Sequence, residues 1–257
     1  NDGPGRSGET SADRTAARLL NTIESVGGPS DYRYTDIPPE FNRDGGQPNA
    51  NIRAAFLYRE SRVMLPARGQ PGPTVAIEVL DGGEGSRPAG PSLSPNPGRI
   101  APGARAFASS RKPLAAEFVF QGQTLFVVSN HFSSKGGDGG LYGRYQSPPL
   151  TSEVQRNLQA SAVAAFVQEL LAANPSAKVI VAGDLNDFHF SPPLQILESA
   201  GLVNLATEFL EPGEIYSYIY EGNSQVLDHI PVTPGLVPGA AIDYVHRYSE
   251  YLFSERY

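Results

Sequence analysis

An acidic and an amide side chain follow a hydrophobic, strand-like run within residues 179–187. Asp184 and Asn186 stand two positions apart, directly after Gly183. Residues i and i+2 of an extended segment point the same way, so both side chains can converge on one ligand. Ligands of α/β sheets bind beyond the carboxyl ends of strands. A plain strand-to-loop turn is the alternative, because Asp and Asn are also common turn residues.

Two further apolar runs end in polar residues. The run at residues 124–132 ends with Asn130 and His131, and the run at residues 225–232 contains Asp228. Three strand ends therefore each offer an acid, an amide or an imidazole. These are the groups that enzymes use to move protons and to hold metal ions.

Several motifs in this order resemble the endonuclease/exonuclease/phosphatase superfamily, whose members are DNase I-like metal-dependent phosphoesterases. Gly183 to Asn186 is similar to its Gly-Asp-x-Asn motif, and Asn130 to Phe132 is similar to its mid-chain histidine motif. Leu227 to His229 is similar to its penultimate aspartate motif, and the resemblance extends to Asn51–Tyr58. The resemblance is closest to secreted bacterial members, which implies a secreted or periplasmic location.

Phosphate-ester hydrolysis needs an activated water, stabilised phosphoryl charge and help for the leaving group. The resemblance implies that Asp184 acts as a base or metal ligand and that Asn186 holds a phosphoryl oxygen, a water or the metal. It implies that His131 contacts the phosphate, and the near-neutral pKa of an unperturbed imidazole permits proton donation. It also implies that Asp228 orients and charge-stabilises a histidine. The implied cofactor is Mg²⁺ or Mn²⁺, with Ca²⁺ as a further alternative.

Two further histidines, His189 and His229, lie outside this set. Residues 228–232 also resemble the terminal Asp-His-x-Pro motif of the family, which would make His229 catalytic. The segment follows Gly-Asp-Leu-Asn too soon for the last strand, and a strand-like segment with Asp243 and His246 comes after it. We therefore expect His229 to be structural. His189 is interpreted as a packing histidine.

Basic side chains that could contact phosphate lie in two places. Arg111 matches a position where relatives carry a phosphate-contacting arginine, although a solvated surface arginine is the alternative. Lys135 lies in the glycine-rich segment 133–140, which could close over a polyanion or could be a plain exposed turn. Further candidates for the same side are Arg144 and Arg156.

Composition restricts the class of protein. A chain of 257 residues fits one large α/β domain. The net charge of −7 provides no general basic field for duplex binding, although bound cations can invert the local potential of an enzyme. The absence of cysteine excludes disulfides, cysteine-ligated zinc and thiol catalysis. No apolar stretch reaches the roughly 18 residues of a membrane span, and no secretory signal opens the chain.

Periodicity predicts alternating strands and helices. Predicted helices cover residues 11–26, 152–173 and 193–199, and predicted strands cover residues 52–58, 117–120, 125–129, 178–183, 202–205, 225–230 and 241–246. The apolar stripe of the long helix is expected to contain Val154, Leu158, Ala162, Ala165, Phe166 and Leu170. Gly and Pro make up half of residues 82–103, which predicts a flexible surface loop. The resemblance implies a four-layered α/β sandwich, with two mixed sheets face to face and helices on both outer faces.

The family pattern also includes elements that this chain lacks. It opens with a strand bearing Asn and a second strand bearing a metal-binding Glu, and it closes with an Asp-His segment. We therefore expect residues 1–257 to form a single domain that is truncated at both ends.

Three functions remain in competition at this point. The first is a nuclease that cuts DNA or RNA, with nucleic acid as its partner and substrate; no protein partner is predicted. A phosphatase or lipid phosphodiesterase on the same fold is the second, and a catalytically inactive binding module is the third. A nuclease should show a groove lined by Arg111, Lys135, Arg144 and Arg156, and a lipid esterase should show an exposed apolar loop beside the cleft.

Overall fold

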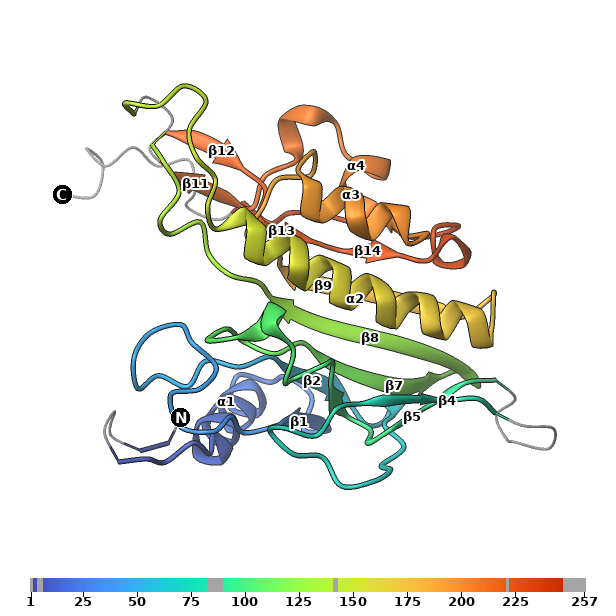
Figure 1. Cartoon of the computed structure of the whole chain (residues 1–257). Helices are drawn as coiled ribbons and strands as arrows, with labels where there is room; N and C mark the ends of the chain where they lie inside the picture. Colours follow the sequence, from blue (N-terminus) through green and yellow to red (C-terminus); the bar gives the residue numbers. More distant parts are fainter. Residues whose placement is uncertain (1, 4–6, 83–89, 141–142, 221, 247–257) are drawn as a thin grey trace.

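The computed structural model describes residues 2–3, 7–82, 90–140, 143–220 and 222–246. Its largest element is an eight-stranded mixed sheet with the path β10-β14-β9-β8-β7-β3, in which β13 also pairs with β9 and β6 with β7 (Figure 1). The strands of this sheet are β3 (Val63–Met64), β6 (Gly98–Arg99), β7 (Leu114–Phe120), β8 (Gln123–His131), β9 (Lys178–Asp184), β10 (Val203–Asn204), β13 (Asp228–His229) and β14 (Pro231–Val232).

Small sheets and helices surround this central sheet. Two-stranded sheets are formed by β1 (Tyr32–Asp36) with β2 (Ala55–Arg59), β4 (Glu78–Leu80) with β5 (Ser92–Ser94), and β11 (Tyr218–Tyr220) with β12 (Asn223–Gln225). The α-helices are α1 (Asp13–Ser25), α2 (Glu153–Ala173), α3 (Pro192–Ser199) and α4 (Leu205–Phe209), and short 3₁₀ helices are η1 (Arg105–Phe107), η2 (Pro212–Glu214) and η3 (Pro234–Leu236). Among the described residues, no helix is both long and apolar enough to cross a membrane.

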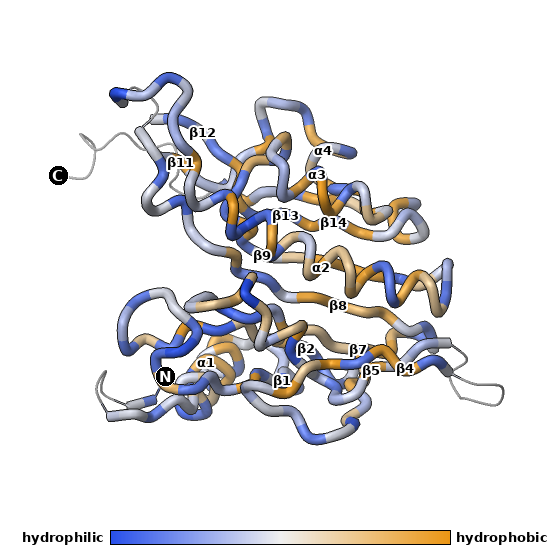
Figure 2. The backbone as a smooth tube through the Cα atoms, viewed as in Figure 1, coloured by the Kyte–Doolittle hydropathy of each residue, from blue (hydrophilic) through white to orange (hydrophobic). Residues whose placement is uncertain are grey.

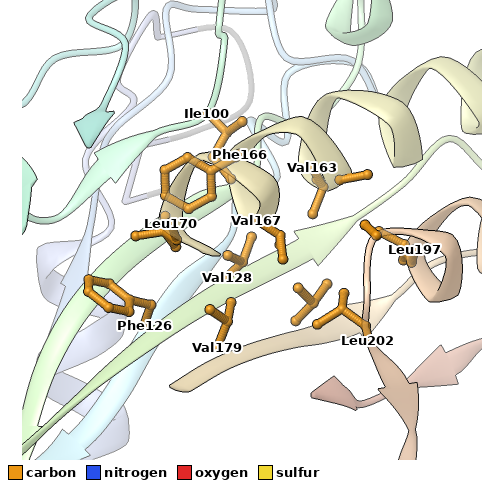
Figure 3. Packing of buried hydrophobic residues seen from close by; sticks show 14 of the residues in the cluster. Ile100, Phe126, Val128, Val163, Phe166, Val167, Leu170, Val179, Leu197 and Leu202 are labelled. Atoms are coloured by element: carbon orange, nitrogen blue, oxygen red, sulfur yellow. The ribbon is translucent and has the colours of Figure 1, made fainter. Parts of the chain in front are cut away.

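Helix α2 is the crossover that makes β8 and β9 parallel neighbours. Parallel strands need a long connection, and α2 supplies it while covering one face of the sheet. Phe126, Val128 and Val179 on the strands pack against Val163 and Leu170 of the helix (Figure 3). Figure 2 shows the same hydrophobic segments along β8 and α2. This core fixes the position of both strands at the edge where they end together.

The buried stripe of α2 contains Phe166 and Leu170, as predicted, but differs from the predicted stripe in its first half. Val154 and Leu158 are 64% and 42% exposed, so they do not face the core. The buried face instead includes Val163 together with the fully buried polar residues Arg156 and Gln159. Hydrophobic periodicity could not assign this face, because it treats both polar residues as solvent-facing. Both polar side chains point toward the segment that follows β8.

The opposite face of the central sheet is covered by the ribbon of β1 and β2. Phe118 of β7 makes edge-to-face contacts with Phe56 and Tyr58 of β2, each with ring centroids 5.4 Å apart. Helix α1 contacts β1 on the side of the molecule opposite α2 and α3 (Figure 1). The predicted α/β fold with more than one sheet and helices on both outer sides is therefore confirmed. In the described residues the second sheet is an antiparallel two-stranded ribbon rather than a mixed sheet.

A flexible surface loop is predicted for residues 82–103. This prediction is wrong for residues 90–103, most of which are buried or half-buried and packed against the sheet. Residues 83–89 lie outside the described residues. Leu93 is completely buried in β5, and Asn96 bonds through its side chain to the backbone of Glu117 in β7. The buried Glu117 carboxylate accepts hydrogen bonds from Arg68 and from the Leu93 amide. Gly and Pro content predicted the irregular backbone but not these side-chain bonds, which replace a regular ladder.

Two other predictions of local structure have opposite outcomes. The hairpin around Gln121 and Gly122 is confirmed, and both residues have the positive φ angles, 50° and 75°, of a tight two-residue turn. The strand predicted over residues 241–246 is wrong, because this segment is irregular. Side chains hold it instead: the Tyr244 hydroxyl donates to the Asp228 carbonyl at 2.7 Å, and the His246 ring donates to the Tyr216 carbonyl at 2.7 Å.

Gly183 generates a prediction about the pairing of β8 with β9. Its φ is +132°, and a Cβ atom there would lie 2.1 Å from the Asn130 carbonyl oxygen. Gly183→Ala should therefore lower the free energy of unfolding by about 3 kcal/mol or more, because the backbone must move. Gly201→Ala is the matched control, since its φ is +93° but its nearest atom, on Leu171, is 3.8 Å away. Equal losses in chemical denaturation would contradict a close approach at Gly183.

Candidate active site

Three ionisable side chains form one row across three neighbouring strands. His131 ends β8 and pairs in register with Asp184, which ends β9, and Asp184 pairs in turn with Asp228 of β13. The Nε2 atom of His131 lies 3.6 Å from Oδ2 of Asp184. The carboxyl ends of parallel β8 and β9 meet at one edge, so their last residues face the same space. The structure therefore brings these three predicted residues together.

Asn186 closes the turn after this row. Its φ is 52°, its backbone amide donates to Oδ1 of Asp184 at 2.9 Å, and its side-chain nitrogen donates to the Phe132 carbonyl at 3.1 Å. The Phe132 amide donates back to the Asp184 carbonyl at 2.9 Å. The side-chain nitrogen thus joins the segments that follow β8 and β9, and the amide oxygen is the atom left to serve as a ligand.

Arg111 lies in the floor of a cleft beside the row. Its guanidinium is buried and donates to the Phe132 carbonyl, while its Nε atom is buried without a hydrogen-bond partner. The cleft has a volume of about 630 Å³, and Arg111 and His131 are part of its lining. The remaining lining residues are all neutral: Gly46, Gln47, Ile52, Ser109, Ser133, Ser134, Gly136, Thr151, Ser152 and Gln155. A guanidinium in the lining of a cleft is suited to contact a phosphoryl oxygen.

The environment shifts the pKa values of the row in opposite directions. Burial raises the pKa of Asp184, and the negative charge of Asp228 raises it further, against the Asn186 amide bond. Burial and the nearby positive charge of Arg111 lower the pKa of His131 to about 4. His131 is therefore a neutral ring at neutral pH, and Asp184 is a stronger base than an ordinary carboxylate.

Asp228 is held by partners from the last third of the chain. Ser217 donates from its hydroxyl to Oδ2 of Asp228 at 2.7 Å, and Tyr244 donates to the Asp228 carbonyl. Burial and the charge of Asp228 raise the pKa of Tyr244 to about 12, so its hydroxyl stays a donor. The Asp228 carboxylate thus acts on His131 through charge and binds a serine, whereas the resemblance implied that it orients a histidine.

Lys135 and Arg156 belong to a buried ion network and not to the cleft wall. Lys135 Nζ lies 2.8 Å from Oδ1 of Asp187, and Arg156 Nε lies 2.7 Å from its Oδ2. Arg156 is fully buried and also lies 3.5 Å from Asp138. Arg144 lies over the Tyr145 ring at 5.6 Å. The predicted row of four basic side chains along a groove is therefore not formed, because two of them neutralise Asp187.

The remaining histidines have structural surroundings. His229 is 1% exposed; its Nε2 donates to the Asp187 carbonyl at 2.9 Å, and its Nδ1 accepts from Asn204 at 3.1 Å. Burial lowers the pKa of His229, so the ring is neutral with one proton on Nε2. His189 packs edge-to-face on Phe190, with ring centroids 5.1 Å apart. Neither ring is among the residues that line the cleft.

A divalent cation is the cofactor that the resemblance implies, and the described side chains fit an open site for one. In the described ranges, no group of three or more His, Cys, Asp or Glu side chains is arranged to hold a metal ion. Asp184 and Asp228 nevertheless bring two carboxylates to neighbouring strands, where a cation would relieve their repulsion. Mg²⁺ commonly binds through one or two carboxylates, waters and substrate phosphates.

Sequence reasoning missed several residues that support the site. Asp187 anchors Lys135 and Arg156, and its place directly after Asn186 was the available signal. The side-chain oxygen Oε1 of Gln159 accepts a hydrogen bond from the Ser133 backbone amide at 2.9 Å, and its side-chain nitrogen Nε2 donates to the Ser110 hydroxyl at 2.8 Å. These bonds fix the loops on both sides of the cleft. Gln159 carried no signal, since a glutamine on a helix is usually exposed.

Comparison with known proteins identifies the class. A model described as the Endonuclease/Exonuclease/phosphatase family matches residues 101–256. The chain belongs to this family. No curated protein matches the chain.

Several solved structures are similar at low sequence identity. The human Nocturnin catalytic domain with bound sulfate is 12% identical, with a TM-score of 0.49 over 86% of this chain and 66% of that chain. A humanized D. rerio TDP2 is 16% identical, with a TM-score of 0.42 over 86% and 76%. A mannosyl-6-phosphatase from Bacteroides thetaiotaomicron is 15% identical, with a TM-score of 0.44 over 85% and 68%. The chain thus spans slightly less than two thirds of the Nocturnin domain.

The opposite charge environments of Asp184 and Asp187 generate a stability prediction. A raised pKa means that the fold disfavours ionised Asp184, so Asp184→Asn should stabilise the ligand-free protein at pH 7. Partial exposure limits the gain to about 1 kcal/mol or less. The gain should shrink as the pH falls toward the ordinary value of 3.8, and it should vanish well below that value, where the carboxyl is protonated in the folded and unfolded states alike.

Asp187→Asn is the matched control. Burial acts to raise the pKa of Asp187, but Lys135 and Arg156 outweigh it and hold the value below its usual range. Its removal takes the counter-charge from Lys135, leaves the buried Arg156 with Asp138 alone, and should cost about 3–5 kcal/mol at pH 7. Thermal melts at pH 7 and pH 4 measure both variants. A loss of stability in Asp184→Asn similar to that in Asp187→Asn would contradict the assigned environments.

Proposed function

We propose that this protein hydrolyses phosphodiester bonds in nucleic acids. Family membership supports phosphoester chemistry, and the row of His131, Asp184 and Asp228 beside the Arg111 cleft is the observation that carries the proposal. Arg111 and His131 line the cleft, and His131 is the register partner of Asp184, which supports a single phosphate site next to these three residues.

Each of these side chains has a separate role in the proposed reaction. Asp184 takes a proton from a water, whose oxygen forms a bond to phosphorus while the opposite P–O bond breaks and the leaving oxygen takes a proton from solvent. Arg111 offsets charge on the phosphoryl oxygens. His131, being neutral, donates a hydrogen bond from its ring N–H. A neutral ring is a poor proton donor in the free protein, and the negative charge of a bound phosphodiester would raise its pKa.

A divalent ion, Mg²⁺ or Mn²⁺ with Ca²⁺ as the alternative, would be held by Asp184 and the Asn186 amide oxygen. Its chemistry would be to neutralise phosphoryl charge and acidify a bound water. The pairing of Asp184 with Asp228 provides the local negative charge that attracts such an ion. The resemblance to secreted bacterial members further leads us to propose a location outside the cytoplasm.

A small phosphate ester is the second candidate substrate. It is favoured by the ion pairs of Lys135 and Arg156 with Asp187, since these leave fewer cations for a long polyanion. The cleft itself presents Arg111 with neutral polar neighbours, which is sufficient for one phosphate group. A phosphatase would use the same row of residues, so the substrate panel of the test decides between them.

Asp184→Ala should remove nearly all turnover with little change in KM. A base or metal ligand acts on the transition state more than on the ground state, so a loss of about 10³-fold or more in kcat is expected. Activity should be measured on single-stranded DNA, RNA and p-nitrophenyl phosphate, with Mg²⁺ and with EDTA. Asp31→Ala, remote from the row and ion-paired with Arg59, is the control and should keep its activity.

Three outcomes would contradict parts of this proposal. Unchanged kcat with a raised KM would assign Asp184 to binding. Hydrolysis of p-nitrophenyl phosphate alone would replace the nuclease with a phosphatase. No metal-dependent hydrolysis of any substrate would favour an inactive binding module.

A further inference from the structure

The β11–β12 hairpin carries two aromatic rings and follows directly after Ser217, a residue that contacts Asp228. Ser217, whose hydroxyl binds the Asp228 carboxylate, is followed directly by Tyr218 at the start of β11. Tyr218 and Tyr220 are two positions apart on one strand, and their rings lie nearly parallel, with centroids 6.2 Å apart and planes at 17°. Residues i and i+2 of a strand share one face, so both rings present the same side of the hairpin.

A second stack joins this hairpin to the site. The rings of Tyr216 and His246 are parallel within 2°, with centroids 3.6 Å apart, and Tyr244 stacks next to His246 at 6.5 Å. The Tyr244 hydroxyl reaches the Asp228 carbonyl. Tyr244 thus connects this second stack to Asp228, and Tyr216 stands two residues before Tyr218, the first residue of β11. We call Tyr218 and Tyr220 the aromatic platform.

The platform is open to solvent although it is aromatic. Tyr218 and Tyr220 are 47% and 51% exposed, so neither ring serves the hydrophobic core. Single exposed rings are common on protein surfaces, but two parallel rings on one strand beside a reactive centre offer a flat binding surface. Flat aromatic surfaces stack with the faces of unpaired nucleobases, at roughly 1–3 kcal/mol per base.

We propose that the aromatic platform binds an unpaired nucleobase next to the scissile phosphate, which makes single-stranded nucleic acid the preferred substrate. This inference rests on the proposed function. A duplex buries its base faces, and the described residues provide no free basic row along the cleft to hold a duplex by its phosphates. Stacking on the platform can replace part of the affinity that such a row would give.

The chemistry of the hairpin tip argues against a lipid surface as the occupant. Gly222, in the turn, and Asn223 and Ser224, at the start of β12, are all exposed. A segment that enters a bilayer presents apolar side chains at its leading end and basic residues behind it. The tip here is polar, and the rings lie along the side of the strand. A ligand that lies against the hairpin fits this arrangement better than a membrane does.

The test compares two oligonucleotides of equal length, one single-stranded poly-dT and one abasic, which share a backbone but differ in their bases. Fluorescence anisotropy of labelled oligonucleotides measures binding without turnover. We expect the protein to bind poly-dT about 10-fold or more tightly than the abasic strand. Tyr218→Ala and Tyr220→Ala should each remove most of this preference and leave affinity for the abasic strand unchanged.

Two control variants accompany these substitutions. Tyr218→Phe keeps the ring and should retain the preference, which separates stacking from hydroxyl contacts. Phe209→Ala removes a 43% exposed ring on α4, at another part of the molecule, and should have no effect (Figure 1). Melting temperatures of all variants establish that the hairpin changes leave the fold intact.

Each outcome bears on one proposal separately. Base-dependent binding without hydrolysis would keep the platform and overturn the proposed nuclease activity. Hydrolysis of poly-dT and of the abasic strand with equal kcat/KM, in the parent protein and both alanine variants, would overturn the platform and keep the nuclease. Binding to phosphatidylcholine and phosphatidylserine vesicles that is lost in the alanine variants would replace the nucleobase with a lipid surface.

Discussion

The parallel pairing of β8 with β9 is the constraint on which the site depends. Its register sets His131 opposite Asp184, and the antiparallel pairing of β13 with β9 adds Asp228 to the same row. Gly183 lets β9 approach β8 closely, because its φ is +132° and a Cβ atom at this position would lie 2.1 Å from the Asn130 carbonyl oxygen. A slip of one residue in either pairing would turn alternate side chains to the other face and separate the row.

Burial around this row sets its chemistry. The same α2 helix that covers the hydrophobic face of the sheet sends Arg156 and Gln159 to the segment after β8. Arg156 and Lys135 neutralise Asp187, while Asp184, three residues earlier, keeps a partly exposed carboxylate facing Asp228. Two acidic residues of one loop thus have opposite roles: Asp187 is a structural counter-ion, and Asp184 is available to a substrate or a cation.

The sequence allowed prediction of what local patterns determine. The helix at residues 152–173 and the strand at 178–183 follow from periodicity and were placed within one residue of α2 and β9. The positions of His131, Asp184 and Asp228 at strand ends were also visible in the sequence, although their roles remain proposals. Hydrogen-bond and ion-pair partners that lie far apart in the chain could not be predicted from the sequence. The bond from Ser217 to Asp228 and the ion pairs of Asp187 depend on tertiary packing, and hydrophobic periodicity says nothing of buried polar residues such as Gln159.

The central claim is that Asp184 is the base and that Asp228 tunes it through charge. The pH dependence of kcat/KM in Asp228→Asn tests this most directly. Removing the negative charge beside Asp184 should lower its pKa, so the acidic limb of the profile should move to lower pH than in the parent protein. An acidic limb that stays in place, or that moves to higher pH, would contradict the account.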